Sequence, residues 1–182
     1  QTGPFSIDMC EGSNFTFNAT YTDVDAADIL TLTSTLASAL PGATITTSGT
    51  NPVVATITWT APGGSAGTNT TFSVTVNDGA CPVQGQQTFV YDINVNPRTL
   101  GGPDRVLCGN QTATLMGTGG STFTWTVLGG PPIVVGTNFS CNPCANPIAS
   151  PTSTTVYQVE SDLSGTCVNR DTITVTIVPD YS

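Results

Sequence analysis

Histidine and lysine are absent from this chain of 182 residues, and arginine occurs three times, as Arg98, Arg105 and Arg170. The twelve acidic residues therefore give a net charge of −9 at pH 7, although only 8% of all residues are charged. Proteins that bind nucleic acid or anionic membranes do so through clusters of Lys and Arg. The sequence therefore predicts a protein that binds neither nucleic acid nor an anionic lipid surface.

The same absences remove the most common catalytic side chains, since general bases and activated nucleophiles usually depend on His or Lys. Asp23 and Asp25 are the nearest approach to the carboxylate pair of a glycoside hydrolase. Two residues of one short segment are poorly placed to flank a substrate from both sides. We therefore expect that the chain is not an enzyme.

Long apolar runs are also missing. No stretch reaches the ~20 apolar residues of a membrane helix, and no basic segment followed by an apolar one resembles a signal peptide. We therefore expect no membrane span. Since the cysteines imply export, we expect a piece of a longer exported protein in preference to a complete mature chain.

Six cysteines without any histidine favour disulfides over zinc. Only Cys141 and Cys144 form a close pair, and no second such pair completes a zinc site. Among the possible pairings we predict the three bonds Cys10–Cys81, Cys108–Cys167 and Cys141–Cys144. Disulfides persist in oxidising compartments, so we expect an extracellular location.

The chain does contain a strand pattern from end to end, and its clearest example is a hairpin over residues 148–178. Thr155, Tyr157 and Val159 share one face of its first strand. The second strand alternates in the same way, with apolar residues at 173, 175 and 177 and threonines at 172, 174 and 176. This alternation is typical of a half-buried antiparallel hairpin.

Similar short runs, separated by Gly and Pro turns, fill the remaining sequence without helical periodicity. We predict strands over residues 5–8, 15–21, 30–32, 43–47, 53–60, 72–76, 89–95, 105–108, 112–116, 123–127 and 133–135. A segment with two prolines and two glycines, residues 95–103, interrupts the pattern. The prediction is an all-β chain of two tandem antiparallel β-sandwich domains, 1–97 and 98–182, with about seven strands each.

A family resemblance rests on several segments of the second half taken in order: residues 102–109, 123–125, 146–152, 154–157, 165–167 and 172–178. Together they resemble the PKD-like and immunoglobulin-like repeats of very large bacterial cell-surface proteins. These proteins are exported by type IX secretion and include gliding-motility adhesins. The first half resembles a cadherin-like or immunoglobulin-like repeat more weakly, through residues 23–32.

This resemblance implies spacer or stalk modules of a secreted or surface-displayed bacterial adhesin or filament. The implied partners are neighbouring modules of the same polypeptide, further copies in a fibre, and extracellular glycans or surfaces. The alternative is a pair of carbohydrate-binding modules attached to a secreted hydrolase, which would need exposed aromatic rings. Trp59 and Trp125 share strand faces with apolar neighbours, as do Tyr21, Tyr91 and Tyr157, so we predict that all five are buried.

Asp23, Asp25 and Asp28 precede a predicted strand and form the strongest candidate for a metal site. Carboxylate oxygens suit Ca²⁺, which accepts six to eight oxygen ligands in flexible geometry. Asp78 joins the set if its turn lies at the same end of the sandwich. The alternative is a solvated acidic turn held by local hydrogen bonds.

One candidate modification site follows from the resemblance. Residues 171–173, Asp-Thr-Ile, are similar to the short O-glycosylation signal of bacteria that use type IX secretion. Because Thr172 faces outward in the predicted strand phase, we expect it to be accessible to a glycan.

Overall fold

The computed structural model describes residues 5–25, 27–79 and 84–179. The chain divides into two compact units, Gln1–Asn96 and Pro97–Ser182, called unit 1 and unit 2 below. Within the described residues, no helix is long and apolar enough to cross a membrane.

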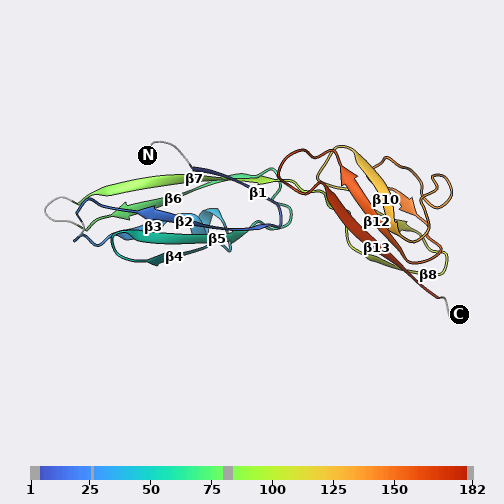
Figure 1. The fold of residues 1–182 in the computed structure, drawn as a ribbon, viewed down its shortest axis with the longest axis horizontal. Coiled ribbons are helices and arrows are strands. Elements are labelled where there is room, and N and C mark those ends of the chain that lie inside the picture. Colours follow the sequence, from blue (N-terminus) through green and yellow to red (C-terminus); the bar gives the residue numbers. More distant parts are fainter. Residues whose placement is uncertain (1–4, 26, 80–83, 180–182) are drawn as a thin grey trace. The chain divides into compact units, whose positions relative to one another are not determined.

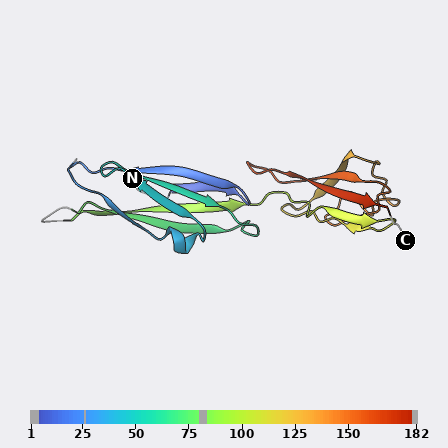
Figure 2. The ribbon, with the colours of Figure 1, turned by 90° about the horizontal axis from the view of Figure 1, so that it is seen from below.

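Unit 1 consists of two facing sheets (Figures 1 and 2), with strand order β1-β7-β6-β3 in one and β2-β5-β4 in the other. Its elements are β1 (Phe5–Cys10), β2 (Asn14–Tyr21), β3 (Thr31–Ser34), α1 (Leu36–Ala39), β4 (Thr44–Ser48), β5 (Val53–Thr60), β6 (Asn69–Asn77) and β7 (Gln86–Asn96). The predicted strands of the first half are confirmed. The single helical turn α1 was not predicted, because four residues are too short to show a helical period.

Alternate residues of each strand fill the space between the two sheets of unit 1. On β5, Ala55, Ile57 and Trp59 are buried, while their neighbours lie closer to solvent. Tyr91 of β7 stacks on Phe72 of β6, with ring centroids 5.0 Å apart. Burying one such side chain contributes about 2 kcal/mol.

Unit 2 has a four-stranded sheet of order β10-β12-β13-β8 and a two-stranded sheet of order β11-β9. Its elements are β8 (Arg105–Cys108), β9 (Ala113–Thr114), β10 (Phe123–Gly129), β11 (Ile148–Ala149), β12 (Thr155–Ser161) and β13 (Arg170–Val178). The predicted hairpin is confirmed, since β12 and β13 are antiparallel and Tyr157 lies opposite Ile173. Trp125, Tyr157 and Ile173 are at the centre of the core.

The predicted strand over residues 133–135 is wrong. Val135 forms only an isolated bridge with Phe139, and Val134 and Val135 are half exposed. Phe139 takes the core position instead, with 2% of its surface exposed. Two prolines precede this segment and Gly136 follows it, so the backbone turns before a ladder can extend.

Both units share one arrangement of strands. The first strand of each pairs in parallel with the last, β1 with β7 and β8 with β13. The last strand pairs on its other side with the strand before it, β6 or β12. Each unit is therefore an immunoglobulin-like β-sandwich, and the chain is a tandem of two.

Residues 99–101 belong to the fold of unit 2. Thr99 is buried, and its hydroxyl shares a hydrogen bond of 2.5 Å with Ser161. The Gly101 N–H donates to the Asp171 carboxylate at 2.8 Å. A Cβ on Gly101 would overlap the Ile173 side chain, so the glycine here permits close packing.

Candidate functional site

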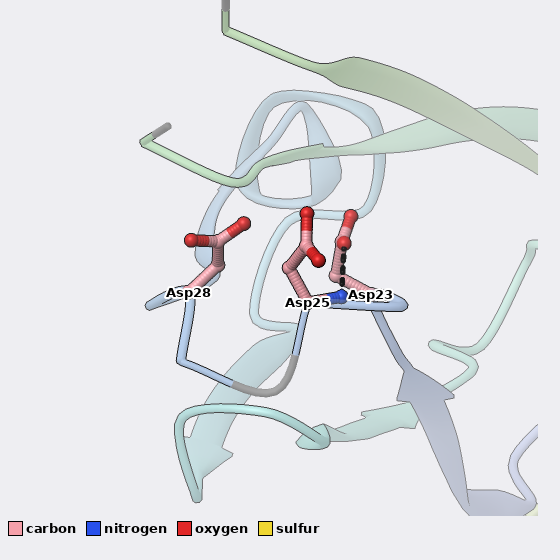
Figure 3. Close-up of side chains that lie close together, drawn as sticks. All are labelled: Asp23, Asp25 and Asp28. Atoms are coloured by element: carbon pink, nitrogen blue, oxygen red, sulfur yellow. Dashed lines mark hydrogen bonds between the residues drawn. The ribbon is translucent and has the colours of Figure 1, made fainter. Parts of the chain in front are cut away.

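The loop between β2 and β3 brings three carboxylates together, as Figure 3 shows. Oxygen atoms of Asp23, Asp25 and Asp28 lie within 4.8 Å of one another. The Asp25 N–H donates to Asp23 Oδ1 at 3.0 Å, and the Asp28 N–H donates to the Asp25 carbonyl at 2.9 Å. These local bonds fold the loop into a turn that directs the three side chains to the same side.

Asn51, in the loop between β4 and β5, fastens this turn to the sandwich. Its Oδ1 accepts the Asp23 N–H at 3.0 Å, and its Nδ2 donates to the Asp25 carbonyl at 3.0 Å. An Asn followed by Pro52 is an ordinary turn signal, so the sequence did not reveal that it positions the acidic loop.

Asp78 lies at the same end of unit 1, as the prediction required for it to join the set. It lines a pocket of about 270 Å³ together with Asp23, Leu30 and Phe89. Its carboxylate accepts the Gly85 N–H at 2.9 Å, which closes the base of the β6–β7 loop.

Negative charge is concentrated at this end of unit 1, and it disfavours the ionised form of Asp28. Loss of hydration raises the pKa of Asp28 above its ordinary value, and the charges of Asp25, Asp23 and Asp78 raise it further. Residues 1–96 contain no Lys, Arg or His to compensate, because all three arginines lie in unit 2. The cluster offers hard oxygen ligands suited to a cation such as Ca²⁺, and calcium binding stays a prediction.

The predicted bond Cys108–Cys167 is wrong, since Cys108 has a free, exposed thiol. Because β8 and β13 run in parallel, Cys108 lies opposite Val178, whereas Cys167 precedes the start of β13 at Arg170. The eight intervening steps of strand span about 26 Å. A disulfide requires Cα atoms within about 7 Å, so these two cysteines cannot bond.

Two further parts of the cysteine prediction differ in outcome. Cys10 and Cys167 are each disulfide-bonded, and Cys81, the predicted partner of Cys10, lies outside the described residues. The Cys141–Cys144 bond is confirmed, with Cα atoms 5.9 Å apart.

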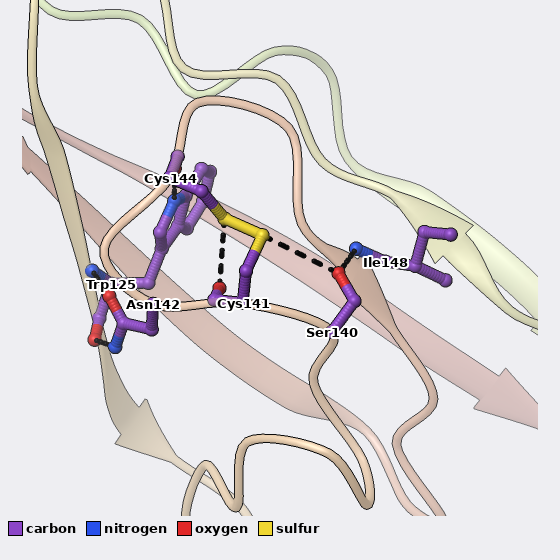
Figure 4. Close-up of a disulfide and its surroundings, with 6 residues drawn as sticks. All are labelled: Trp125, Ser140, Cys141, Asn142, Cys144 and Ile148. Atoms are coloured by element: carbon purple, nitrogen blue, oxygen red, sulfur yellow. Dashed lines mark hydrogen bonds between the residues drawn. A yellow bond between two sulfur atoms is a disulfide. The ribbon is translucent and has the colours of Figure 1, made fainter.

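The Cys141–Cys144 turn lies along the outer edge of β10 (Figure 4). Asn142, between the two cysteines, accepts the Trp125 N–H at 2.9 Å and donates to the Trp125 carbonyl at 2.7 Å. The Cys144 N–H donates to the Phe123 carbonyl at 3.0 Å. The Trp125 indole N–H donates in turn to the Cys144 carbonyl at 2.8 Å. The turn thus forms hydrogen bonds with the outer side of β10, where a further strand would otherwise pair.

The five aromatic residues predicted to be buried are buried. Trp59 and Trp125 have 5% and 1% of their surface exposed, and Tyr21, Tyr91 and Tyr157 have no more than 5% exposed. A groove of about 430 Å³ nevertheless opens between β1 and β2, where neither strand has a second neighbour. Half-buried Phe5 and Phe17 are among the residues that line it.

Thr172 is exposed on β13, as its predicted strand phase requires, and its glycosylation stays a prediction. Arg170 pairs with Glu160 at 3.0 Å, its register partner on β12, and not with the adjacent Asp171. Successive residues of a strand face opposite sides of the sheet, so sequence neighbours cannot pair in this way.

Neither a comparison with models of protein families nor a search of curated proteins gives a match. Similar solved structures include the titin domains z1z2 in complex with telethonin, at 19% identity and a TM-score of 0.42, covering 98% of this chain and 94% of that one. The sialic acid binding region of a Streptococcus sanguinis SK1 adhesin is 11% identical with a TM-score of 0.38, covering 98% and 77%.

An endo-fucoidan hydrolase of glycoside hydrolase family 107 is also similar, at 13% identity and a TM-score of 0.37, covering 98% of this chain and 28% of that one. Each identity is below 20% and each TM-score is below 0.5. The assignment of both units as immunoglobulin-like therefore follows from their strand order and register.

Proposed function

We propose that the chain is a pair of structural spacer modules of a secreted or surface-displayed bacterial adhesin or filament. The observation that carries this proposal is the parallel pairing of the first and last strands in each unit. β1 and β7 pair over six residues, and β8 and β13 pair over four.

Parallel terminal strands give each unit a defined response to tension. A load applied between the ends of a unit acts on the N-terminal end of the first strand and on the C-terminal end of the last strand. These two points lie at opposite ends of the parallel pair. The two strands then slide along each other, and all hydrogen bonds between them share the load. Antiparallel terminal strands would instead open one bond at a time. This arrangement suits a module that transmits force between a cell surface and an attached target.

The bacterial adhesin in particular is supported by the resemblance of residues 102–178 to PKD-like repeats of proteins exported by type IX secretion. The Cys141–Cys144 disulfide is consistent with an oxidising, extracellular setting. In this proposal the chain has no catalytic role, because it lacks His and Lys and its acidic cluster lies within one loop.

Single-molecule force spectroscopy tests the spacer proposal. The chain is held at its two ends, with Cys10, Cys81, Cys108 and Cys167 replaced by Ser so that the load passes only through folded units. We expect two unfolding events, each releasing on the order of 300 Å of chain. As a control, unit 1 is pulled through cysteines placed at the adjoining ends of β6 and β7, which loads an antiparallel pair from one end. Equal unfolding forces in both geometries would refute the proposal.

The carbohydrate-binding alternative is favoured by one observation, the groove between β1 and β2 with Phe5 and Phe17 at its wall. Aromatic rings that reach solvent stack on sugar rings. Retardation by soluble polysaccharides in affinity electrophoresis, lost on Phe17→Ala and kept on Phe15→Leu, a half-buried position that does not line the groove, would support a glycan site there. Unchanged migration across acidic and neutral polysaccharides would remove it.

Calcium binding at Asp23, Asp25, Asp28 and Asp78 belongs to the same proposal as a way to stiffen one end of unit 1. Its support is the convergence of Asp23, Asp25 and Asp28, the pocket that Asp78 lines together with Asp23, and the absence of basic residues from residues 1–96. A bound cation would neutralise the repulsion that raises the pKa of Asp28.

A further inference from the structure

β10 is an edge strand, since it pairs with β12 on one side only. An edge strand presents unpaired N–H and C=O groups that can accept a strand of another molecule. Natural proteins block such edges with charged residues, proline or bulges, or by covering them. Residues 123–127 of β10, Phe-Thr-Trp-Thr-Val, contain no charge and no proline, and β-branched and aromatic side chains favour strand pairing.

The turn around Cys141 and Cys144 covers this edge where it is most regular. Trp125 lies opposite Val159 in the ladder with β12, and its own N–H and C=O face the outer side, where both bond to Asn142. The Asn142 amide bonds to both groups and thereby takes the place of one strand residue. The Phe123 carbonyl, two residues earlier on the same side, is taken by the Cys144 N–H.

We propose that the Cys141–Cys144 turn is a disulfide-locked edge cap, which keeps β10 from pairing with β10 of a second copy of this chain. Asn142 lies between the two cysteines, so their bond restricts the backbone that holds its amide against Trp125. A dithiol opens the lock by giving two electrons and two protons to the S–S bond, which becomes two thiols while the dithiol becomes a disulfide.

Once uncovered, the edge of β10 is suited to pair with β10 of a second copy. Two β10 strands placed antiparallel about a twofold axis at Trp125 would exchange the hydrogen bonds that Asn142 now makes, giving a self-complementary interface. Thr124 and Thr126 are exposed, and Thr124 of each copy would lie across from Thr126 of the other, where Thr–Thr pairs are favourable. Glu160 lies on β12, on the side of β10 away from this edge, and is paired with Arg170 of β13, so neither places an unpaired charge at the edge.

Sedimentation velocity of the full chain tests the proposal, with Cys108→Ser in every protein to exclude crosslinks through its exposed thiol. The variants are Asn142→Ala and the double variant Cys141→Ser/Cys144→Ser. The matched control is Asn138→Ala, whose side chain makes the same two kinds of bond, to the Val134 N–H and the Pro132 carbonyl, away from β10. We expect the parent and the control to stay monomeric. Both test variants should dimerise, with a dissociation constant for the dimer at least tenfold lower than that of the parent.

A second substitution distinguishes edge pairing from misfolding. Thr126→Lys places a charge on the exposed face of β10 and should return the dimerising variants to monomers, with unchanged near-ultraviolet circular dichroism. Asn142→Ala keeps the disulfide, so it reports on the edge even if the double serine variant does not fold. Monomeric Asn142→Ala would overturn the proposal, and so would dimers that persist with Thr126→Lys.

Discussion

Two tyrosine hydroxyls face each other inside unit 1, and their removal gives a prediction with a definite sign. Tyr21 Oη and Tyr91 Oη lie 2.8 Å apart, and the two side chains are 5% and 4% exposed. Replacing either residue by Phe leaves the other hydroxyl buried without this partner. Such an unsatisfied group costs about 1–3 kcal/mol of unfolding free energy. For a domain of this size that lowers the melting temperature by roughly 4–8 °C per kcal/mol.

The double variant Tyr21→Phe/Tyr91→Phe should cost little more than either single one, because it leaves no hydroxyl unpaired. The expected coupling energy is about 1–2 kcal/mol. Chemical denaturation followed by fluorescence measures it, since the two tryptophans, Trp59 and Trp125, report on unit 1 and unit 2 respectively. Tyr157→Phe, in unit 2, is the control and should move only the Trp125 transition.

Additive costs of the two single variants, or single costs below about 0.5 kcal/mol, would refute the reasoning and indicate that solvent satisfies the hydroxyls. The pH dependence supplies a second check. Burial raises the pKa of both Tyr21 and Tyr91 above the ordinary value of 10.0. The folded state therefore keeps protons that the unfolded chain releases, so stability is full below about pH 10 and declines as the pH rises from there. The double variant should lose this part of the decline.

Three further predictions concern the acidic loop and unit 2. Calorimetric titration of Ca²⁺ into chelator-treated protein should release heat and raise the melting temperature, and Asp28→Asn should weaken both; no heat in the parent would remove the calcium site. Because the pKa of Asp28 is raised, its contribution to stability without Ca²⁺ is present at low pH and lost as the pH rises through that pKa. Melting curves across pH 3–7 should therefore show a fall in melting temperature, and Asp28→Asn should abolish this fall. Gly101→Ala should cost about 1–3 kcal/mol through overlap with Ile173, whereas Gly63→Ala, which meets nothing within 4 Å, should be nearly neutral in the same denaturation assay; equal effects would refute the close-packing argument.

The strands could be predicted from the sequence because alternation is a local property. On β5, Ala55, Ile57 and Trp59 repeat with a period of two, and that period alone identifies the buried face. Phe139 could not be placed in the core in this way, because its neighbours Thr137, Asn138 and Ser140 show no alternation. Its burial depends on a loop that brings it into a bridge with Ala149 of β11, ten residues further along the chain.

The cysteine pairing failed for a reason that no local pattern contains. Whether Cys108 and Cys167 lie at the same end of unit 2 depends on whether β8 runs parallel or antiparallel to β13. Only the tertiary fold decides this direction. The Cys141–Cys144 bond, by contrast, follows from a separation of three residues.

The acidic loop was visible in the sequence, but what holds it was not. Asp23, Asp25 and Asp28 are close in sequence, so their proximity was expected. Asn51 is 26 or more residues away, and its two bonds to the loop arise only when β2 and β5 pair along their length. Asn142 was missed for the same reason, since its partner Trp125 is 17 residues distant.

The placement of the three arginines also decides how the chain meets proteases. Enzymes of trypsin-like specificity cut after Lys or Arg, and residues 1–96 offer no such bond. Arg105 and Arg170 lie within β8 and β13, where the backbone is hydrogen-bonded in a sheet. Arg98 is exposed, but the next residue, Thr99, is 2% exposed and its N–H donates to the Val168 carbonyl at 3.0 Å. A folded chain of this kind would persist in surroundings rich in such enzymes.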